Sequence, residues 1–384
     1  MTDVQKCFIS LIRNVVVGVE LLADFKTCDL AELYKLSKKQ DMAHIIAYGL
    51  KQNNLIDLGS DLWKKYYNKQ YSMAQFRVMN LEHEYEKICN VLENAEIDYI
   101  PMKGSVIRPL YPEAWMRVSS DIDILVHKED LIKSEKIIAD LLNYTIENEG
   151  EIRGYHKHVK APNGFVVELH WLLTDRDVLS RTYMDDVWNR VSLSNNTKHQ
   201  YKLNDDLFYL YHIFHASKHF KDGGCGSRVI LDTWLINNKL GIDSQNCKEM
   251  LEKSELYGFA VALESIAVKW FSGIENEKYD LVEEYIFNGG VYGGGNHYAA
   301  WQSETNGKSI SYYFKRAFPS YSYMCKRDLE LKEKPYLLPY YWFKRLFVAF
   351  GKRDSKRTKA EIKTAWLEKE KSKKIKAMFD ELGL

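Results

Sequence analysis

The sequence lacks paired cysteines. Its six cysteines are scattered over 384 residues, and none belongs to a C-x-x-C motif. This pattern indicates neither a disulfide framework nor a thiolate zinc site, so a reducing, cytoplasmic location is expected. The chain must therefore be stabilised by burial of apolar surface, and its length suffices for two or three domains with cores of their own.

Long apolar runs are also missing. No uncharged apolar stretch reaches the length of about 18 residues that a membrane-spanning helix needs. The apolar N-terminal stretch is interrupted by Arg13, Asn14 and Glu20, and no small-residue cleavage site follows it. We therefore expect an amphipathic helix at the N-terminus instead of an export signal, and no transmembrane segment.

A strong overall charge is absent as well, because the formal net charge is only +1. Composition alone therefore indicates no class of binding partner. Lys and Arg do outnumber Asp and Glu from Tyr341 to Leu384, but interleaved acidic residues favour a solvated face. Contact of this tail with RNA or an anionic membrane stays open. The tyrosines that cluster after Ser309 fit helix packing, with a stacking platform for bases as the alternative.

The first hundred residues predict helices. They contain no proline, and apolar residues recur three and four positions apart. The predicted helices span 4–22, 30–36, 42–52 and 62–93.

The pattern changes between Ile97 and Trp171, where short strands are indicated, and the turn Pro162-Asn163-Gly164 joins the last two. The predicted strands span 99–102, 121–126, 156–160 and 165–171, with a helix at 128–142. Further helices are predicted at 205–220, 227–239, 249–271 and 278–288. The fold class is therefore α+β, with a small mixed sheet flanked by helical segments. We expect an N-terminal helical segment at 1–95, a catalytic core at 96–200, a helical binding domain at 201–300 and an aromatic, basic helical extension at 301–384.

Two aspartates carry the strongest chemical signal. In a strand, alternate side chains share a face, so Asp121 and Asp123 project together while Ile122 and Ile124 pack on the other side. Like charges held this close resist ionisation unless a cation lies between them, and magnesium is the obvious candidate. A pair of divalent ions could then clamp a phosphoryl displacement. A turn cap beside a solvated edge residue is the alternative.

Two further segments support this interpretation. Lys103-Gly104-Ser105 follows an apolar strand and precedes a short helix, where backbone amides, a hydroxyl and a lysine could hold phosphate; an ordinary strand-to-helix turn would look the same. Glu168 and His170 share one face of an apolar strand. A carboxylate there is costly unless it is paired or bound to metal, so Glu168 is a candidate third ligand, with a salt bridge as the alternative.

These residues support a family resemblance. The run MKGSVIRPLYPEAWMRVSSDIDILV, followed by VVELHW, resembles the core of the nucleotidyltransferase superfamily, which has a DNA polymerase β-like fold, and in particular a bacterial branch of it. HIFHASKHF, RVILDTWL, FPSYSYM and YLLPYYWFKR also resemble that branch, so the similarity covers most of the chain. In the superfamily, the gap between the serine and the first aspartate is usually shorter, so local geometry from Ile107 to Trp115 is expected to differ.

The resemblance implies roles for individual residues. Asp121, Asp123 and Glu168 match the catalytic, metal-binding acids, while Gly104 and Ser105, next to Lys103, match the phosphate-holding glycine and serine. The lysine and aspartate that related enzymes take from their helical domain correspond to Lys218 and Asp232. Arg117 could steady a phosphate or form a surface ion pair. Three histidines at helical spacing could be packed, face the cleft or bind zinc: His212, His215 and His219.

The resemblance therefore implies an enzyme that moves a nucleoside monophosphate from a nucleoside triphosphate such as ATP to a hydroxyl group, releasing pyrophosphate, with Mg²⁺ or Mn²⁺ as cofactor. The acceptor could be a small molecule or sugar, a protein side chain, or RNA, as in toxin-like relatives that act on tRNA. A catalytically silent scaffold that binds nucleotide is the alternative from another class. The sequence indicates neither the base of the nucleotide nor the oligomeric state.

Overall fold

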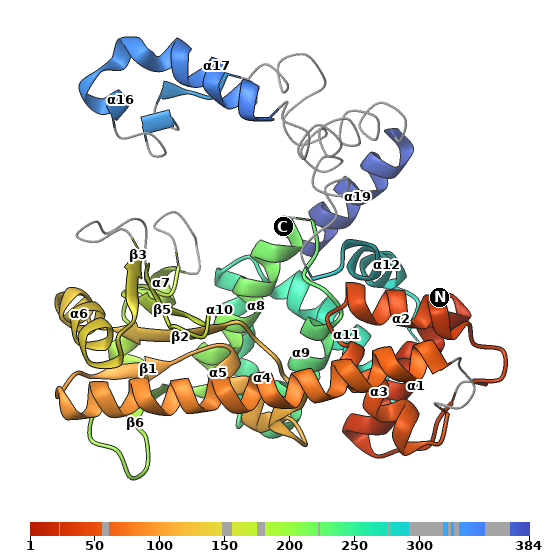
Figure 1. The fold of residues 1–384 in the computed structure, drawn as a ribbon. Coiled ribbons are helices and arrows are strands. Elements are labelled where there is room, and N and C mark those ends of the chain that lie inside the picture. Colours follow the sequence, from red (N-terminus) through yellow and green to blue (C-terminus); the bar gives the residue numbers. More distant parts are fainter. Residues whose placement is uncertain are drawn as a thin grey trace.

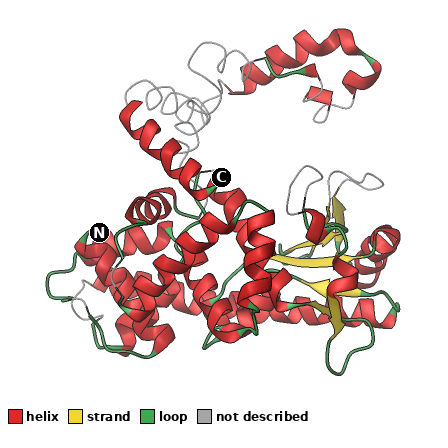
Figure 2. Cartoon of the chain, turned by 180° about the vertical axis from the view of Figure 1, so that it is seen from behind, coloured by secondary structure: helices red, strands yellow, loops and turns green. Residues whose placement is uncertain are grey.

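A computed structural model gives the fold of the protein. It describes residues 1–22, 24–55, 61–147, 156–174, 181–221, 223–274, 276–291, 318–321, 324–325, 330–349 and 369–384. Much of the expected aromatic and basic extension at 301–384 lies outside these residues. The described part is the predicted α+β fold, in which a five-stranded mixed sheet is flanked by helices (Figure 2).

Four helices form the N-terminal part, as predicted: α1 (Asp3–Val17), α2 (Leu30–Lys39), α3 (Ala43–Gln52) and α4 (Asp61–Asn94). Helix α1 ends earlier than its apolar pattern suggests. Gly18 adopts a left-handed conformation with φ of 78°, and its N–H donates to the carbonyl oxygen of Asn14. Glycine takes this conformation at little cost, and it terminates the helix. Helix α4 runs along the whole length of the sheet and the neighbouring helices (Figure 1).

The sheet brings together two strands that are far apart in the sequence. Its order is β1-β2-β5-β4-β3, with only β2 and β5 running parallel among these neighbours. The strands are β1 (Tyr99–Pro101), β2 (Asp121–Val126), β3 (Thr145–Glu147), β4 (His156–Lys160) and β5 (Val166–His170). The predicted strands at 121–126 and 156–160 are confirmed at both ends, whereas β3 was not predicted.

The two faces of the sheet differ in chemistry. Ile122, Ile124 and Val126 of β2 share a core with residues of α4 and α6 (Leu131–Leu142), which follows the single turn η4 (Lys128–Asp130). Because side chains alternate along a strand, Asp121 and Asp123 project from the opposite face. The helices α4 and α6 thus cover the apolar face of β2 and leave the acidic face for the site.

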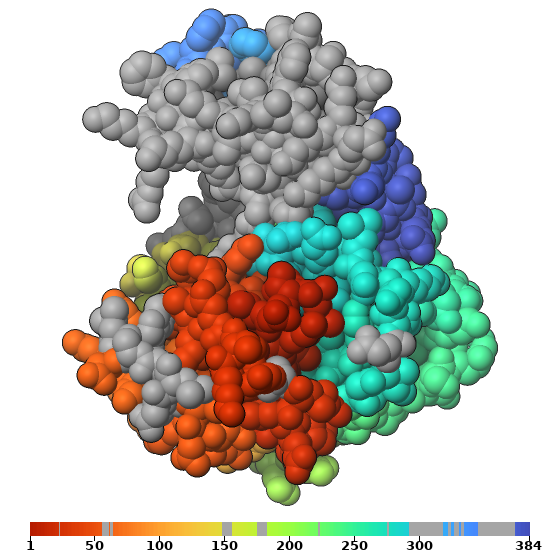
Figure 3. All heavy atoms as spheres, turned by 90° about the vertical axis from the view of Figure 1, so that its right-hand side faces the viewer, coloured from red at the N-terminus to blue at the C-terminus, as the bar shows by residue number. Residues whose placement is uncertain are grey.

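The second half of the described chain is helical: α8 (Asp205–Lys221), α9 (Arg228–Lys239), α10 (Ser244–Lys253), α11 (Tyr257–Ser272) and α12 (Asp280–Gly289). The N-terminal helices share a core with these, and the rings of Phe8 and Phe287 lie 5.9 Å apart. Figure 3 shows the two groups of helices side by side. Early and late segments of the chain therefore form one helical body beside the sheet.

One predicted helix is wrong. The apolar pattern at 249–271 suggested a single helix, but the structure has α10 and α11 there, separated by a turn. Glu255 has a positive φ of 56° in that turn. A residue in this conformation cannot continue a right-handed helix, so the chain changes direction between the two.

The remaining elements are short or C-terminal. Three short elements lie between β1 and β2: α5 (Gly104–Ile107), η2 (Arg108–Leu110) and η3 (Ala114–Met116). Four more lie between β5 and α8, and the last two of them form a small hairpin: α7 (Arg181–Met184), η5 (Val187–Arg190), β6 (Val191–Leu193) and β7 (Tyr201–Leu203). The C-terminal elements are α16 (Glu330–Glu333), η6 (Pro335–Leu337), α17 (Leu338–Ala349) and α19 (Lys369–Leu382). In the described ranges, no helix combines the length and apolarity needed to cross a membrane.

Candidate active site

Two carboxylates and one imidazole meet on the acidic face of the sheet. Asp123 and Glu168 are direct register partners on the parallel strands β2 and β5. His170, two positions after Glu168, has its Nε2 atom 3.0 Å from Oδ1 of Asp123 and 3.3 Å from Oε2 of Glu168. Ligand atoms of the three residues all lie within 4.8 Å of one another. This group, Asp123, Glu168 and His170, is called the acidic group below, and it could hold a metal ion.

A lysine extends into the acidic group from the end of β1. Nζ of Lys103 lies 2.5 Å from Oδ1 of Asp123 and 3.5 Å from Oε2 of Glu168. The backbone of Lys103 has φ of 45° and ψ of −115°, a conformation that residues with a side chain rarely adopt. Strain of this kind persists only where the surroundings enforce it, and it is concentrated at functional sites. Lys103 therefore supplies a positive charge to the two acids from a constrained position.

The charges in this group are coupled. Burial raises the pKa of Asp123, against the influence of Lys103 and His170. Burial opposes ionisation of Glu168 too, but the hydrogen bond from His170 and the charge of Lys103 hold its pKa well below the usual range. For Lys103, burial is outweighed and the pKa is raised, an effect we attribute to the two carboxylates. The site thus keeps Glu168 anionic and Lys103 cationic at neutral pH.

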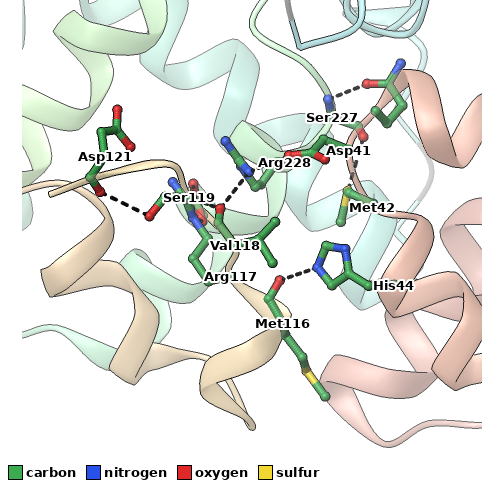
Figure 4. A network of polar contacts seen from close by, with 12 residues as sticks. Asp41, Met42, His44, Met116, Arg117, Val118, Ser119, Asp121, Ser227 and Arg228 are labelled. Carbon is green, nitrogen blue, oxygen red and sulfur yellow. Dashed lines mark hydrogen bonds and ion pairs between the residues drawn. The ribbon is translucent and has the colours of Figure 1, made fainter. Parts of the chain in front are cut away.

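Asp121 stands apart from the acidic group. It is half-buried at the start of β2, and its main-chain oxygen accepts a hydrogen bond from the hydroxyl of Ser119 at 3.3 Å (Figure 4). It does not belong to the acidic group found among the described residues, although it lines the same pocket as Asp123. The aspartate pair expected from the sequence therefore faces one pocket, but only Asp123 contacts Glu168 and His170 directly.

A pocket of about 290 Å³ is lined by Lys103, Asp121 and Asp123, whereas Glu168 and His170 do not belong to its described wall. Its wall comes from the sheet, from α8 and α9, and from the N-terminal helices, so it lies where the three parts of the fold meet. The lining residues that carry charge or an imidazole are Asp41, Arg77, Lys103, Arg117, Asp121, Asp123, His212, His215, His219, Arg228 and Asp232. Both cationic side chains and carboxylates line this cavity, which suits a ligand that brings both phosphate and metal.

Arg117 and Asp232, both expected to contact nucleotide, pair with each other. Nε of Arg117 lies 3.0 Å from Oδ1 of Asp232, which also accepts a hydrogen bond of 2.6 Å from the hydroxyl of Tyr111. Arg117 is 8% exposed and Asp232 is 4% exposed, so the pair is buried and not at the surface. Both residues nonetheless line the pocket, and their pairing joins α9 to the segment that precedes β2.

The other expected phosphate contacts divide into two groups. Gly104 lines the pocket, and a Cβ atom there would approach the hydroxyl oxygen of Ser119 to 3.2 Å, which is tight. Ser105 and Lys218 do not belong to the described wall of this pocket. Lys218 is exposed on α8. The glycine of the predicted motif thus allows close packing at the pocket, whereas its serine does not line it.

Sequence reasoning missed several residues of the site. His170 was noted for sharing a face with Glu168, yet it was given no role; its position two residues after Glu168 was the available signal. Arg228, at the start of α9, donates from Nη1 to the carbonyl oxygen of Val118 at 3.1 Å and contacts Oδ2 of Asp41 at 3.4 Å (Figure 4). Nothing in the local sequence links Arg228 or Asp41 to the sheet, because the three segments meet only in the folded chain.

Comparison with known proteins agrees with the resemblance. Residues 26–272, more than half of the chain, match a family described as "Uncharacterised nucleotidyltransferase". A solved structure of the antibiotic-resistance factor ANT(2'')-Ia is similar over 54% of this chain and 97% of its own, at 10% identity and a TM-score of 0.29, which is too low to support a conclusion. No curated protein matches the chain. By the extent of the family match, the chain belongs to the family of uncharacterised nucleotidyltransferases.

Proposed function

We propose that this protein is a metal-dependent nucleotidyltransferase, which moves a nucleoside monophosphate from a nucleoside triphosphate to an acceptor hydroxyl and releases pyrophosphate. The observation that carries the proposal is the register pairing of Asp123 with Glu168 beside Lys103, where Asp123 and Lys103 line a pocket. Buried carboxylates facing one another are costly unless cations neutralise them. Such an arrangement is typical of a site that works on phosphates.

The donor atoms fit a divalent ion. Two carboxylates suit Mg²⁺, which prefers oxygen ligands, and the additional imidazole is acceptable to Mn²⁺. Asp123 and Glu168 would hold the ion, with Asp121 contributing from the pocket side. When bound, the ion would neutralise charge on the phosphates and stabilise the attacking and leaving oxygens.

The chain's own groups would perform the remaining tasks. Lys103 holds the carboxylates close together and favours their ionised forms, and we propose that it also neutralises part of the phosphate charge. Gly104 leaves room for a phosphate near the main chain. Arg117 and Asp232 would shape the wall through their mutual ion pair, and Lys218 would contact the part of the nucleotide outside the pocket.

We assign the removal of the acceptor proton to Glu168. It is half-buried and anionic, so it can accept a proton, but its lowered pKa makes it a weak base while His170 and Lys103 contact it. Catalysis would then consist mainly of positioning and charge neutralisation, without a covalent nucleophile. Small molecules or sugars, protein side chains and RNA, including tRNA, are the acceptor classes to be tested.

The contact between Lys103 and Asp123 favours a second candidate function. An ammonium group 2.5 Å from the carboxylate already neutralises it, as a metal ion would. A protein that binds nucleotide without transferring it could retain such a contact as a permanent substitute for the metal. If the protein is such a silent scaffold, its nucleotide binding should not depend on divalent ions.

The test is release of pyrophosphate from each nucleoside triphosphate, with Mg²⁺ or Mn²⁺ and an extract of the host cell as the source of acceptor. Asp123→Asn and Glu168→Gln should each lower the rate by about a hundredfold or more, because each removes a charge that the reaction needs. Asp140→Asn, on the exposed face of α6, is the matched control and should keep the wild-type rate. Metal-independent nucleotide binding without any release would instead support the scaffold. An RNase-sensitive product would identify RNA as the acceptor.

A further inference from the structure

Helix α8 presents two histidines to the pocket as a close pair. The Nε2 atoms of His215 and His219 lie 3.0 Å apart, and both residues line the pocket. The third histidine of this helix face behaves differently, because Nε2 of His212 is 3.0 Å from the hydroxyl oxygen of Thr233 on α9. The structure thus separates one packed histidine from a pair whose Nε2 atoms lie within hydrogen-bond distance of each other.

The distance within this pair matches that of a chelate. With bonds of about 2.1 Å from metal to imidazole nitrogen, two nitrogens 3.0 Å apart subtend an angle of about 90° at the ion. This is the angle between adjacent ligands of an octahedral ion, whereas tetrahedral coordination would separate them by about 3.4 Å. Spacing of four residues places both rings on one side of the helix, as in the H-E-x-x-H motif of zinc enzymes.

The protonation state of His215 also suits metal binding. Metal binding requires imidazole nitrogens that carry no proton. Burial, with help from the charge of Lys103 and from His219, lowers the pKa of His215 well below its ordinary value, so this ring is neutral at pH 7. Without an ion, the two Nε2 atoms at 3.0 Å share an N–H···N hydrogen bond.

We propose that His215 and His219 form a chelating pair for a borderline divalent metal ion such as Ni²⁺, Co²⁺ or Zn²⁺, distinct from the acidic group. Imidazole nitrogen favours these ions over Mg²⁺, which the carboxylates favour. The other coordination positions would face the pocket, where water or anionic oxygens of a ligand complete them. This site does not depend on the proposed catalytic reaction, since binding alone defines it.

The test is a calorimetric titration of the tag-free full chain with Ni²⁺, in a buffer that contains excess Mg²⁺ to occupy the carboxylates. We expect one Ni²⁺ per chain, and at least a tenfold loss of affinity in both His215→Ala and His219→Ala. His170→Gln removes the imidazole of the acidic group and serves as the matched control, which should bind Ni²⁺ as the wild type does. Unchanged binding in the two alanine variants, or loss only in His170→Gln, would overturn the proposal.

A second measurement needs no variant. Crystals of the unmodified protein soaked in Ni²⁺ should show an anomalous-scattering peak within bonding distance of both Nε2 atoms. A peak confined to the acidic group, or no peak in the pocket, would mean that the histidines only share a hydrogen bond. This experiment decides the question even if an alanine variant fails to fold.

Discussion

Nζ of Lys103 lies 2.5 Å from Oδ1 of Asp123, closer than its 3.5 Å contact with Oε2 of Glu168. The lysine follows β1, whereas the two acids sit on the neighbouring strands β2 and β5. A single ammonium therefore offsets two carboxylates that are brought together by strand pairing. Any cation that binds these carboxylates has to compete with Lys103.

This competition makes the effect of Lys103→Met predictable. Removing one partner of a buried ion pair leaves the other charges uncompensated and costs about 3–5 kcal/mol. The metal-free variant should therefore unfold at a lower temperature than the wild type. Added Mg²⁺ or Mn²⁺ should raise its melting temperature by more than that of the wild type, because no ammonium competes and binding stabilises the folded state.

Thermal unfolding with EDTA and with Mg²⁺ measures both effects. Lys136→Met, on the exposed face of α6, is the control and should change neither value. Equal metal-induced shifts in the wild type and Lys103→Met would show that Lys103 and the ion do not share the carboxylates.

The two aspartates of β2 should differ in their contribution to metal binding. Asp123 belongs to the acidic group, whereas Asp121 only lines the adjacent pocket. Asp123→Asn should weaken Mn²⁺ binding by about tenfold to a hundredfold, and Asp121→Asn should weaken it less. Electron paramagnetic resonance of free Mn²⁺ gives both dissociation constants. A larger loss in Asp121→Asn would mean that the ion is held mainly on the pocket side.

The ion pair of Arg117 and Asp232 should contribute mainly to the stability of the fold, and less to nucleotide affinity. Their buried ion pair links α9 to the segment before β2, so Asp232→Asn should destabilise the protein by about 3–5 kcal/mol. Lys376→Ala breaks the exposed pair with Asp380 and should cost no more than about 0.5 kcal/mol. Urea unfolding measures both values. If Asp232→Asn instead keeps full stability and loses only nucleotide affinity, the role implied by the family resemblance is the correct one.

The local part of the fold and site could be predicted from the sequence. The alternation of Asp121, Ile122, Asp123 and Ile124 predicts both the strand and the face on which the acids lie, because alternation is a property of neighbouring residues. The period of three and four predicts α1 to α4 for the same reason. The break at Glu255 escaped prediction because a positive φ leaves no trace in an apolar pattern.

Contacts between distant segments could not be predicted from local sequence patterns. No local pattern predicts that β2 pairs in parallel with β5, so the contact between Asp123 and His170 could not be predicted. Arg117 was expected at the surface or on phosphate because its partner, Asp232, lies 115 residues away. The sequence indicates which residues carry chemistry, while tertiary packing determines which of them pair with each other.

Stability in mild acid should depend on His212. Burial lowers the pKa of this residue from its ordinary 6.5 to about 4, and nearby Asp232 only partly opposes the shift. Between these two values the unfolded chain binds a proton that the folded chain does not, so the free energy of unfolding falls as the pH falls. One such histidine accounts for up to about 3 kcal/mol over this range. His44, whose pKa is also lowered to about 4, contributes in the same direction.

The histidine contributions can be separated by the slope of stability against pH, which is insensitive to a constant loss caused by the substitution itself. His212→Asn removes one titrating group, so its free energy of unfolding should fall less steeply from pH 6.5 to pH 5 than that of the wild type, while the fall due to His44 persists. His83→Asn, on the exposed side of α4, should keep the wild-type slope. Identical slopes for His212→Asn and the wild type would mean that His212 takes up its proton equally in both states, which is incompatible with a neutral ring packed against Thr233.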